Sequence, residues 1–212
     1  MERKESAAAF RRLPREDRRA ELLRAAVELA FEDGLGRVTA RRIAARVDVA
    51  QGLVTHYFKS VDGILAAVFE FVAERERDTV DALATGDPLE TFRRQLSFYV
   101  SPDRDPAALL WLDAWRESAH RPILRQAVIR QMELDVADLT SLIATGRARG
   151  AFPDSSESSA MRILALLDGL AANAAVRAGL SEPILDYANA TSFIISTIER
   201  ELGAPPGALA LG

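Results

Sequence analysis

The 212-residue chain contains no cysteine and only two histidines, His56 and His120. Without cysteine it can form no disulfide, iron–sulfur cluster or thiolate nucleophile. Two histidines this far apart cannot build a histidine-rich metal site, and a Ser-His-Asp enzyme would have to use one of them. No apolar run approaches the roughly 18 residues that a membrane-spanning helix needs. We therefore expect a soluble, cytoplasmic protein without a membrane segment and without a metal or other cofactor.

The charged residues are distributed unevenly along the chain, whose formal net charge is −4. Residues 1–60 hold 13 Lys and Arg against 9 Asp and Glu, whereas residues 61–212 hold 14 against 22. A basic first part and an acidic second part suggest that only the first part meets an anionic partner. Two solvated faces of a single domain would give the same counts, so charge alone does not decide between these alternatives.

Apolar residues recur at helical spacing along nearly the whole chain, and no segment alternates as a strand would. We expect a first domain over residues 1–60, a helical body over 61–203 and a disordered tail over 204–212, with Asp62 as the N-cap of the body's first helix. The pattern predicts an all-α fold of about nine helices, at residues 15–33, 40–47, 51–58, 62–83, 88–100, 107–119, 122–149, 161–178 and 183–203.

The two short helices predicted at 40–47 and 51–58 have the pattern of a helix-turn-helix. Asp48 falls at the turn, where a positive φ is needed, and Asp tolerates that conformation better than most residues. With the helix before it, such a pair places its second short helix in the major groove of DNA. Short amphipathic helix pairs are common, so a purely structural pair remains the alternative. The positions expected to bury apolar groups between the helices are Ile43, Val47, Val49, Val54 and Tyr57.

Two details favour DNA binding. Arg41 and Arg42 lie in the first turn of their helix, where the helix dipole disfavours cations unless an anion such as a phosphate is near. The outward side of the next helix offers short or hydrogen-bonding groups that suit close approach to bases and phosphates. The candidate DNA-binding residues are Thr39, Arg41, Arg42, Gln51, Gly52, Leu53, Thr55, His56, Tyr57 and Lys59.

Three segments carry a resemblance to a known family. They are AELLRAAVELAFEDG, VTARRIAARVDVAQGLVTHYF and KSVDGILAAVFE, in this order within the first 70 residues. In these segments the chain resembles the TetR family of bacterial transcriptional regulators. HYF followed by DGIL, and more loosely LLWLDAWRESA and IRQMELDVADLTSLIATGRARGAF, are similar to the subgroup that includes the choline-responsive repressor BetI. Thr55, Val61 and Asp48 depart from the family, which commonly has an aromatic residue, Lys and Gly there.

The resemblance implies a dimeric transcriptional regulator that binds a palindromic double-stranded DNA operator. We expect this regulator to be a repressor. It also implies that an unknown small-molecule effector binds in the carboxyl-terminal domain and releases the operator. An all-helical enzyme, or an adaptor without DNA binding, is the alternative. Against an enzyme, the chain has no pair of Glu-x-x-His motifs and no glycine-rich phosphate loop, so we expect no catalytic activity.

Aromatic residues of the body are candidates to line an effector pocket. Trp111 and Trp115 lie four residues apart on one helical face, and with Asp113 or Glu117 near them they could hold a cation. The alternative is that aromatics at this spacing are simply core residues. The full set of pocket candidates is Phe69, Phe92, Phe98, Tyr99, Trp111, Trp115, Met132 and Asn173, of which we select Phe69, Phe98, Trp111, Trp115 and Asn173.

The segment 161–178 is apolar nearly all round, so it must be buried on more than one side. Packing against the body's own core and against a second subunit explains this, and the last helix could complete a four-helix interface. A central helix of a monomer is the alternative. The candidate interface residues are Leu167, Leu170, Ala174, Phe193, Ile194 and Ile198.

Overall fold

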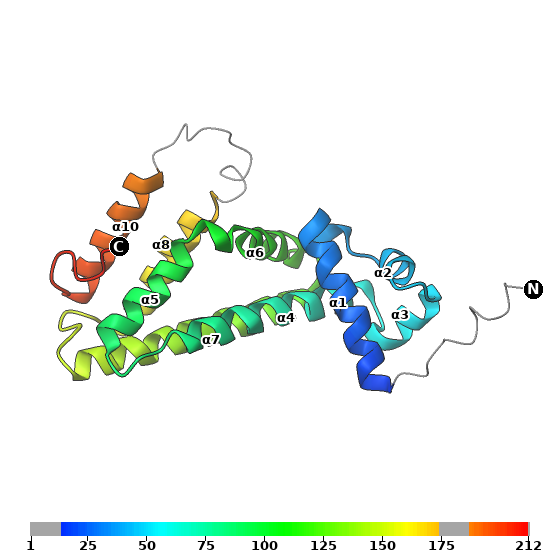
Figure 1. The fold of residues 1–212 in the computed structure, drawn as a ribbon, viewed down its shortest axis with the longest axis horizontal. Helices are drawn as coiled ribbons and strands as arrows, with labels where there is room; N and C mark the ends of the chain where they lie inside the picture. Colours follow the sequence, from blue (N-terminus) through cyan, green and yellow to red (C-terminus); the bar gives the residue numbers. More distant parts are fainter. Residues whose placement is uncertain (1–13, 174–186, 212) are drawn as a thin grey trace, which may run out of the picture.

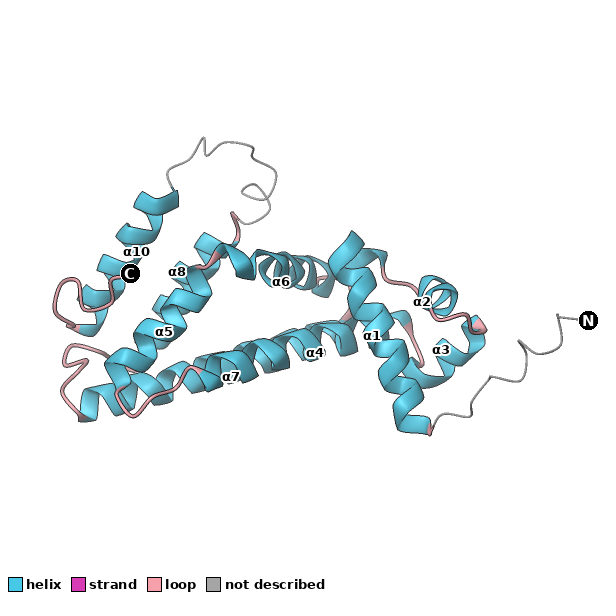
Figure 2. Ribbon diagram, viewed as in Figure 1, coloured by secondary structure: helices cyan, strands magenta, loops and turns pink. Residues whose placement is uncertain are grey.

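The computed structural model describes residues 14–173 and 187–211 (Figure 1). All regular structure in this part is helical, which confirms the predicted all-α class (Figure 2). No helix in these two ranges is long and apolar enough to cross a membrane. The nine α-helices and two 3-10 helices described are α1 (Arg15–Asp33), η2 (Leu35–Arg37), α2 (Ala40–Arg46), α3 (Gln51–Phe58), α4 (Val61–Ala82), α5 (Pro88–Val100), η3 (Pro102–Arg104), α6 (Asp105–Ser118), α7 (Pro122–Ala148), α8 (Ser159–Ala171) and α10 (Tyr187–Leu202).

Helices α1, α2 and α3 form a small unit at one end of the molecule, which we call the head (Figure 1). Its centre is closed by Leu22 of α1, Ile43 of α2 and Val54 of α3, none of which is exposed. The same apolar core continues into α4, α6 and the start of α7. The head is therefore packed onto the rest of the chain, which we call the body, and not merely tethered to it.

The body is built along two long helices, α4 and α7, which lie side by side (Figure 1). They run in the same direction, because Asp62 contacts the start of α7 and Arg77, fifteen residues later, contacts Asp135. Helices α5, α6 and α8 cover this pair, and α10 packs on α8. A second apolar core around Phe152 and Ile163 closes the end of the body far from the head.

Asp62 does not cap the helix that contains it, so that prediction was wrong. Ser60 caps α4 by accepting a hydrogen bond from the Gly63 amide at 3.0 Å. The Asp62 carboxylate instead accepts from the amides of Ile123 and Leu124, at 2.9 and 3.0 Å. These amides belong to the first turn of α7, whose positive end favours a carboxylate. Asp62 thus joins the start of α4 to the start of α7.

The prediction of a disordered tail was also wrong for residues 204–211. Leu209 is fully buried, and its amide donates to a carboxylate oxygen of Glu199 at 2.8 Å. The Gly207 amide donates to the other oxygen at 3.1 Å. Glu199 is itself buried on α10, and a buried carboxylate requires such donors. The two amide donors of the tail hold residues 204–211 against α10.

Candidate nucleic-acid interface and ligand cavities

The turn between α2 and α3 has the conformation that the sequence predicts. Asp48 adopts a positive φ of 53°, and the Val49 amide donates to the Ala44 carbonyl at 2.9 Å. Thr39 caps α2 by accepting from the Arg42 amide at 3.3 Å. This turn fixes the direction in which α3 leaves α2.

Helix α3 buries one side and exposes the other. Val54 and Phe58 are buried against the head core, whereas Gln51, Thr55 and His56 are exposed. A Cβ added at Gly52 would meet nothing within 4 Å, so packing within the chain does not require a glycine there. The exposed side is therefore a low, hydrogen-bonding surface of the kind that approaches base edges.

The arginines of α2 differ in their partners. Arg42 forms an ion pair with Asp33 of α1 and donates to the Arg37 carbonyl at 3.1 Å, and Arg46 pairs with Glu32. The Arg42 guanidinium holds the pKa of the Asp33 carboxyl group below its usual range, and the Arg46 guanidinium does the same for Glu32. Asp33 thus compensates the cation at the start of α2 in the chain without DNA, and a phosphate contact of Arg42 stays a prediction.

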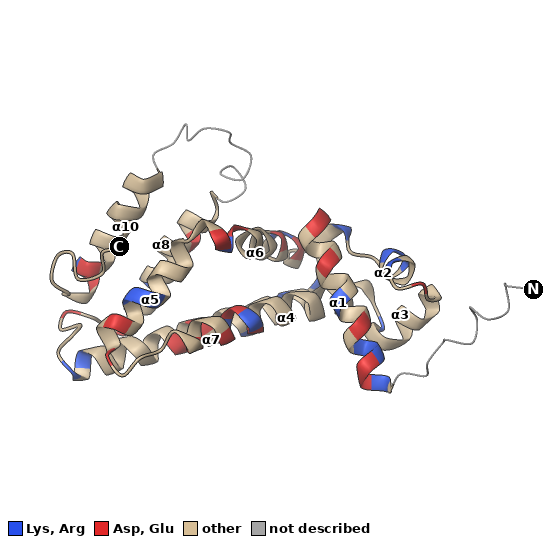
Figure 3. Ribbon diagram, in the orientation of Figure 1, with Lys and Arg blue, Asp and Glu red and all other residues tan. Residues whose placement is uncertain are grey.

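Two other cations of the head are exposed beside α3. Arg41 lies on the outer side of α2, and Lys59 follows the last residue of α3 with a positive φ of 62°. Figure 3 shows the basic positions on α2 next to α3. These side chains flank the exposed side of α3, as phosphate-binding residues do on either side of a recognition helix.

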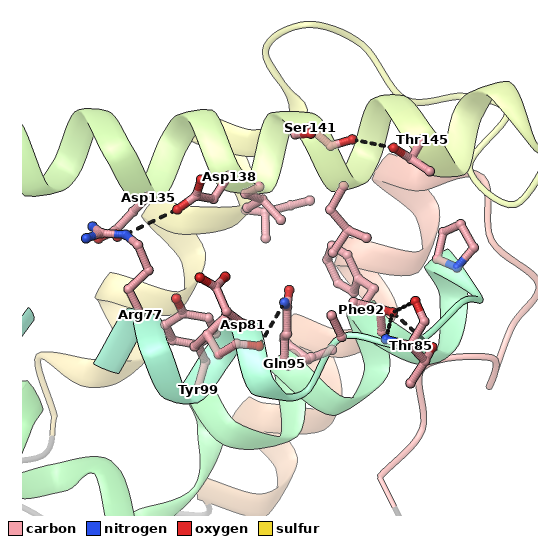
Figure 4. Close-up of a pocket in the computed structure, with 18 of the residues that line it drawn as sticks. Arg77, Asp81, Thr85, Phe92, Gln95, Tyr99, Asp135, Asp138, Ser141 and Thr145 are labelled. Atoms are coloured by element: carbon pink, nitrogen blue, oxygen red, sulfur yellow. Dashed lines mark hydrogen bonds and ion pairs between the residues drawn. The ribbon is translucent and has the colours of Figure 1, made fainter. Parts of the chain in front are cut away.

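The larger of two neighbouring cavities in the body has a volume of about 410 Å³, and we call it the outer cavity (Figure 4). It lies between the end of α4, α5, α7 and α8. Figure 4 shows Arg77, Tyr99 and Asp135 near one end and Thr85 near the other. Its apolar wall includes Val80, Ala84, Pro88, Phe92, Leu96, Leu139, Leu142, Ile163, Leu164 and Leu167.

The inner cavity, of about 50 Å³, is lined by three aromatic residues, Tyr99, Trp111 and Trp115. The Trp111 indole donates to Glu76 of α4 at 2.7 Å. The Trp115 indole nitrogen is buried and has no hydrogen-bond partner among the described residues. The remaining wall is formed by Arg104, Met132, Asp135, Val136, Met161, Leu164, Leu167 and Asp168.

One carboxylate of the inner cavity has no cationic partner. Arg104 pairs with Glu76 at 2.8 Å, and Arg77 pairs with Asp135 at 2.7 Å. Asp168 of α8 forms no ion pair within 4.0 Å with any residue in the described ranges. Burial raises its pKa to about 6 although the cation of Arg104 lowers it, because the charged form has lost water without gaining a paired counter-ion. A small cation among the aromatic rings would supply that counter-ion.

Helix α6 contacts both the inner cavity and the head. Trp111 and Trp115 face the cavity, with ring centroids 5.9 Å apart. Asp113, between them, accepts a hydrogen bond from the Leu35 amide at 2.8 Å. Leu35 begins η2, the 3-10 helix that leads from α1 towards α2. A shift of α6 would therefore displace η2 and, through it, the helices of the head.

Two family models match the chain. Residues 22–68 match bacterial regulatory proteins of the tetR family, and residues 88–203 match the carboxyl-terminal domain of BetI-type transcriptional repressors. The chain belongs to the TetR family. It is a transcriptional regulator with a DNA-binding helix-turn-helix head and a ligand-binding body, not an enzyme.

Individual TetR-family proteins agree with this assignment. The chain is 30% identical over 171 residues to the HTH-type transcriptional regulator BetI of Burkholderia thailandensis, covering 78% of this chain and 85% of that protein. It is 28% identical over 191 residues to BetI of Escherichia coli strain K12, covering 87% and 94%. Its fold is similar to a putative transcriptional regulator from Saccharomonospora viridis in complex with choline, with a TM-score of 0.74 at 22% identity, over 88% of this chain and 98% of that one.

The ligand-site residues predicted for this TetR-family chain fall into two groups. Trp111 and Trp115 line the inner cavity, Phe92 the outer cavity and Tyr99 both. The selection of Phe69 was wrong, because it is fully buried in the core, edge-on to Trp111 at a centroid distance of 4.7 Å.

Two other selections, Phe98 and Asn173, line neither of the two cavities. Asp113 and Glu117 are on the side of α6 that faces the head, so they are not the carboxylates beside the tryptophans.

Sequence reasoning missed the charged residues of the inner cavity, Arg104, Asp135 and Asp168. The first two lie in segments that carry several charges, so nothing in the pattern separates them from solvated residues. Asp168 could have been found, because it is the one carboxylate in an otherwise nearly wholly apolar segment, 161–178. A lone carboxylate in a segment that must be buried indicates a partner or a ligand.

The predicted interface residues on α8 and α10 fall into two groups, buried and accessible. Leu167, Leu170 and Ile198 are buried within the single chain, so they were wrong as surface available to a partner. Their burial arises because α8 and α10 pack on each other. Phe193 is 61% exposed and Ile194 is half-buried, so these remain candidates. Ala174 lies outside the described residues.

Proposed function

We propose that the chain is a homodimeric repressor that binds a palindromic operator and is released from it by a small organic cation. As a regulator of genomic DNA it acts in the cytoplasm. Two symmetric heads read the same bases on opposite strands, which requires a palindromic site. Gln51 and His56 on the exposed side of α3 contact base edges, while Arg41 and Lys59 contact phosphates.

The single observation that supports a cationic effector is the unpaired Asp168 carboxylate beside three aromatic residues. Aromatic faces attract a quaternary or other organic ammonium group, and a carboxylate neutralises its charge. A desolvated cation–π contact contributes on the order of 2 kcal/mol. The Saccharomonospora viridis neighbour was solved with choline, and the relatives carry the name BetI, so choline is the first candidate. The free Trp115 N–H would suit an acceptor such as the choline hydroxyl.

Release follows from the two contacts of α6. A cation drawn between Trp111, Trp115 and Asp168 moves α6 relative to α8, and Asp113 passes the movement to the Leu35 amide. The two heads must stand about 34–36 Å apart, or a multiple of that, to enter major grooves on one face of DNA. The effector lowers operator affinity to the extent that it binds the DNA-incompetent arrangement more tightly.

The experiment uses operator fragments selected from genomic DNA by the purified protein. We expect choline to release the operator and to change tryptophan fluorescence over the same concentration range. Trp115→Ala shifts both curves to higher choline and leaves operator affinity without choline nearly intact. If choline and other small ammonium compounds affect neither signal while the protein binds its operator, the proposed effector class is wrong.

A further inference from the structure

The inner and outer cavities are neighbours that share part of their walls. Tyr99, Asp135, Leu164 and Leu167 line both of them. Figure 4 shows Tyr99 and Asp135 near the end of the outer cavity that lies away from Thr85. The aromatic cavity therefore adjoins, along these residues, a space about eight times larger.

The two volumes suit different parts of a ligand. A site that holds a whole drug-sized ligand has roughly 300–1,000 Å³, and the outer cavity of about 410 Å³ lies in that range. The inner cavity of about 50 Å³ does not, since roughly 10–15 Å³ is needed for each water-sized group. It has room for about four such groups, which is the size of a trimethylammonium head.

The chemistry of the two walls differs in the same way. The inner cavity has Asp168 and the indole rings of Trp111 and Trp115, which suit a cation, while the Tyr99 ring already faces the Arg104 guanidinium at 5.1 Å. The outer cavity has an apolar wall that includes Phe92, Leu96 and Leu142, which suits a hydrocarbon chain. Its charged lining residues are Arg77, Asp81, Asp135, Asp138 and Arg149, and Arg77 pairs with Asp135 at 2.7 Å and with Asp138 at 3.2 Å near the wall shared with the inner cavity.

We propose that one elongated ligand occupies both cavities, with a small ammonium head in the inner cavity and an apolar tail in the outer cavity. The effector class is then a cationic amphiphile, such as a choline ester of a medium-length carboxylic acid. The inference rests on the proposed cationic effector, and it adds that the tail provides most of the affinity.

The test measures binding of choline, butyrylcholine and octanoylcholine to the full-length protein by calorimetry. Each methylene that becomes buried raises affinity up to roughly fourfold, so octanoylcholine should bind at least a hundredfold more tightly than choline. Equal affinities for the three compounds would overturn the proposal while leaving the cationic effector in place. Binding of none of them, with operator binding intact, would instead reject the proposed effector class itself.

Two variants that fill the outer cavity locate the tail. Thr145→Trp on α7 and Ala84→Trp after α4 both place an indole at positions that line the outer cavity alone, and both residues are exposed. We expect each to reduce octanoylcholine affinity to near that of choline. Ala144→Trp is the matched control, because Ala144 is the exposed neighbour that lines neither cavity, and it should bind octanoylcholine as the unmodified chain does.

The location of the tail is rejected by either of two results. One is that Thr145→Trp and Ala84→Trp both retain the full preference for octanoylcholine. The other is that they weaken choline and octanoylcholine by the same factor, which would mean that filling the outer cavity removes no affinity contributed by the tail.

Discussion

The backbone at Gly146 has no room for a side chain, because the Phe152 ring occupies the place where a Cβ would lie. A Cβ built there would be 2.0 Å from the ring, and Phe152 is fully buried in the second apolar core. The close approach brings the end of α7 against the chain that leads to α8. A glycine in the last turns of a long helix is otherwise unfavourable by about 1 kcal/mol relative to alanine.

Gly146→Ala should therefore destabilise the protein, by about 1–3 kcal/mol or more in urea unfolding, because Phe152 must leave its position. Gly169→Ala on α8 is the matched control, since a Cβ there meets nothing within 4 Å. It should be neutral or slightly stabilising, as alanine favours the helix. Equal effects of the two substitutions would show that the Phe152 contact does not constrain α7.

The raised pKa of the Asp168 carboxyl group predicts that effector binding depends on pH. Burial is the largest cause of its raised pKa of about 6, which Arg104 lowers and Asp135 raises. Because the pKa in the folded chain exceeds that in the unfolded chain, protonated Asp168 stabilises the ligand-free fold at low pH. That stabilisation is lost as pH rises through about 6.

Choline affinity should have the opposite trend, because the cation requires the ionised carboxylate. From pH 7.5 to 5 it should fall by about tenfold in calorimetry. Asp168→Asn should bind choline weakly with little pH dependence, and its free energy of unfolding at pH 7.5 should exceed that of the unmodified chain. A pH profile unchanged by this substitution would remove Asp168 from the site.

At the scale of the helices, local information was sufficient to predict most of the bounds. The predicted ranges 15–33, 51–58 and 88–100 match α1, α3 and α5, since caps, prolines and apolar spacing act within a few residues. The positive φ of Asp48 was predicted for the same reason. The true partner of Asp62 lies 61 residues away, so no local pattern could reveal it.

The candidate site was predictable only in part, for a related reason. Helical spacing shows that Trp111 and Trp115 share a face, but not which helices that face meets. The carboxylate beside them comes from α8 and not from Asp113, because α6 is oriented by its contact with η2. Side chains that meet across helices depend on packing angles, which the apolar pattern does not determine.

The contact between α6 and η2 should carry the effector signal. Asp113→Ala removes the acceptor of the Leu35 amide without altering either cavity wall. We expect choline affinity measured by tryptophan fluorescence to stay near that of the unmodified chain, while the choline concentration that releases the operator rises severalfold. Asp113→Asn retains an acceptor and serves as the control. Release that is unchanged in Asp113→Ala would assign the coupling to α4 instead.

At the scale of the whole molecule, we expect the exposed side chain of Phe193 to lie in the surface that meets a second subunit. Phe193 on α10 is 61% exposed, and Met161 on α8 is 54% exposed. Phe193→Glu should yield monomers in sedimentation and weaken operator binding, because a single head contacts half of a palindrome. Ser192→Glu, next to it and also exposed, is the control for the added charge. A dimer unchanged by Phe193→Glu would place the interface on another surface.

The proposed mechanism requires that effector and operator oppose each other through one pair of arrangements of this chain. The most direct measurement is the choline affinity of the purified protein by calorimetry, first alone and then with saturating operator DNA. Linkage requires that the operator weaken choline binding by the same factor by which choline weakens operator binding, typically 5–150-fold. We predict equal factors within that range. The same choline affinity with and without operator would show that the effector site and the operator site are not coupled.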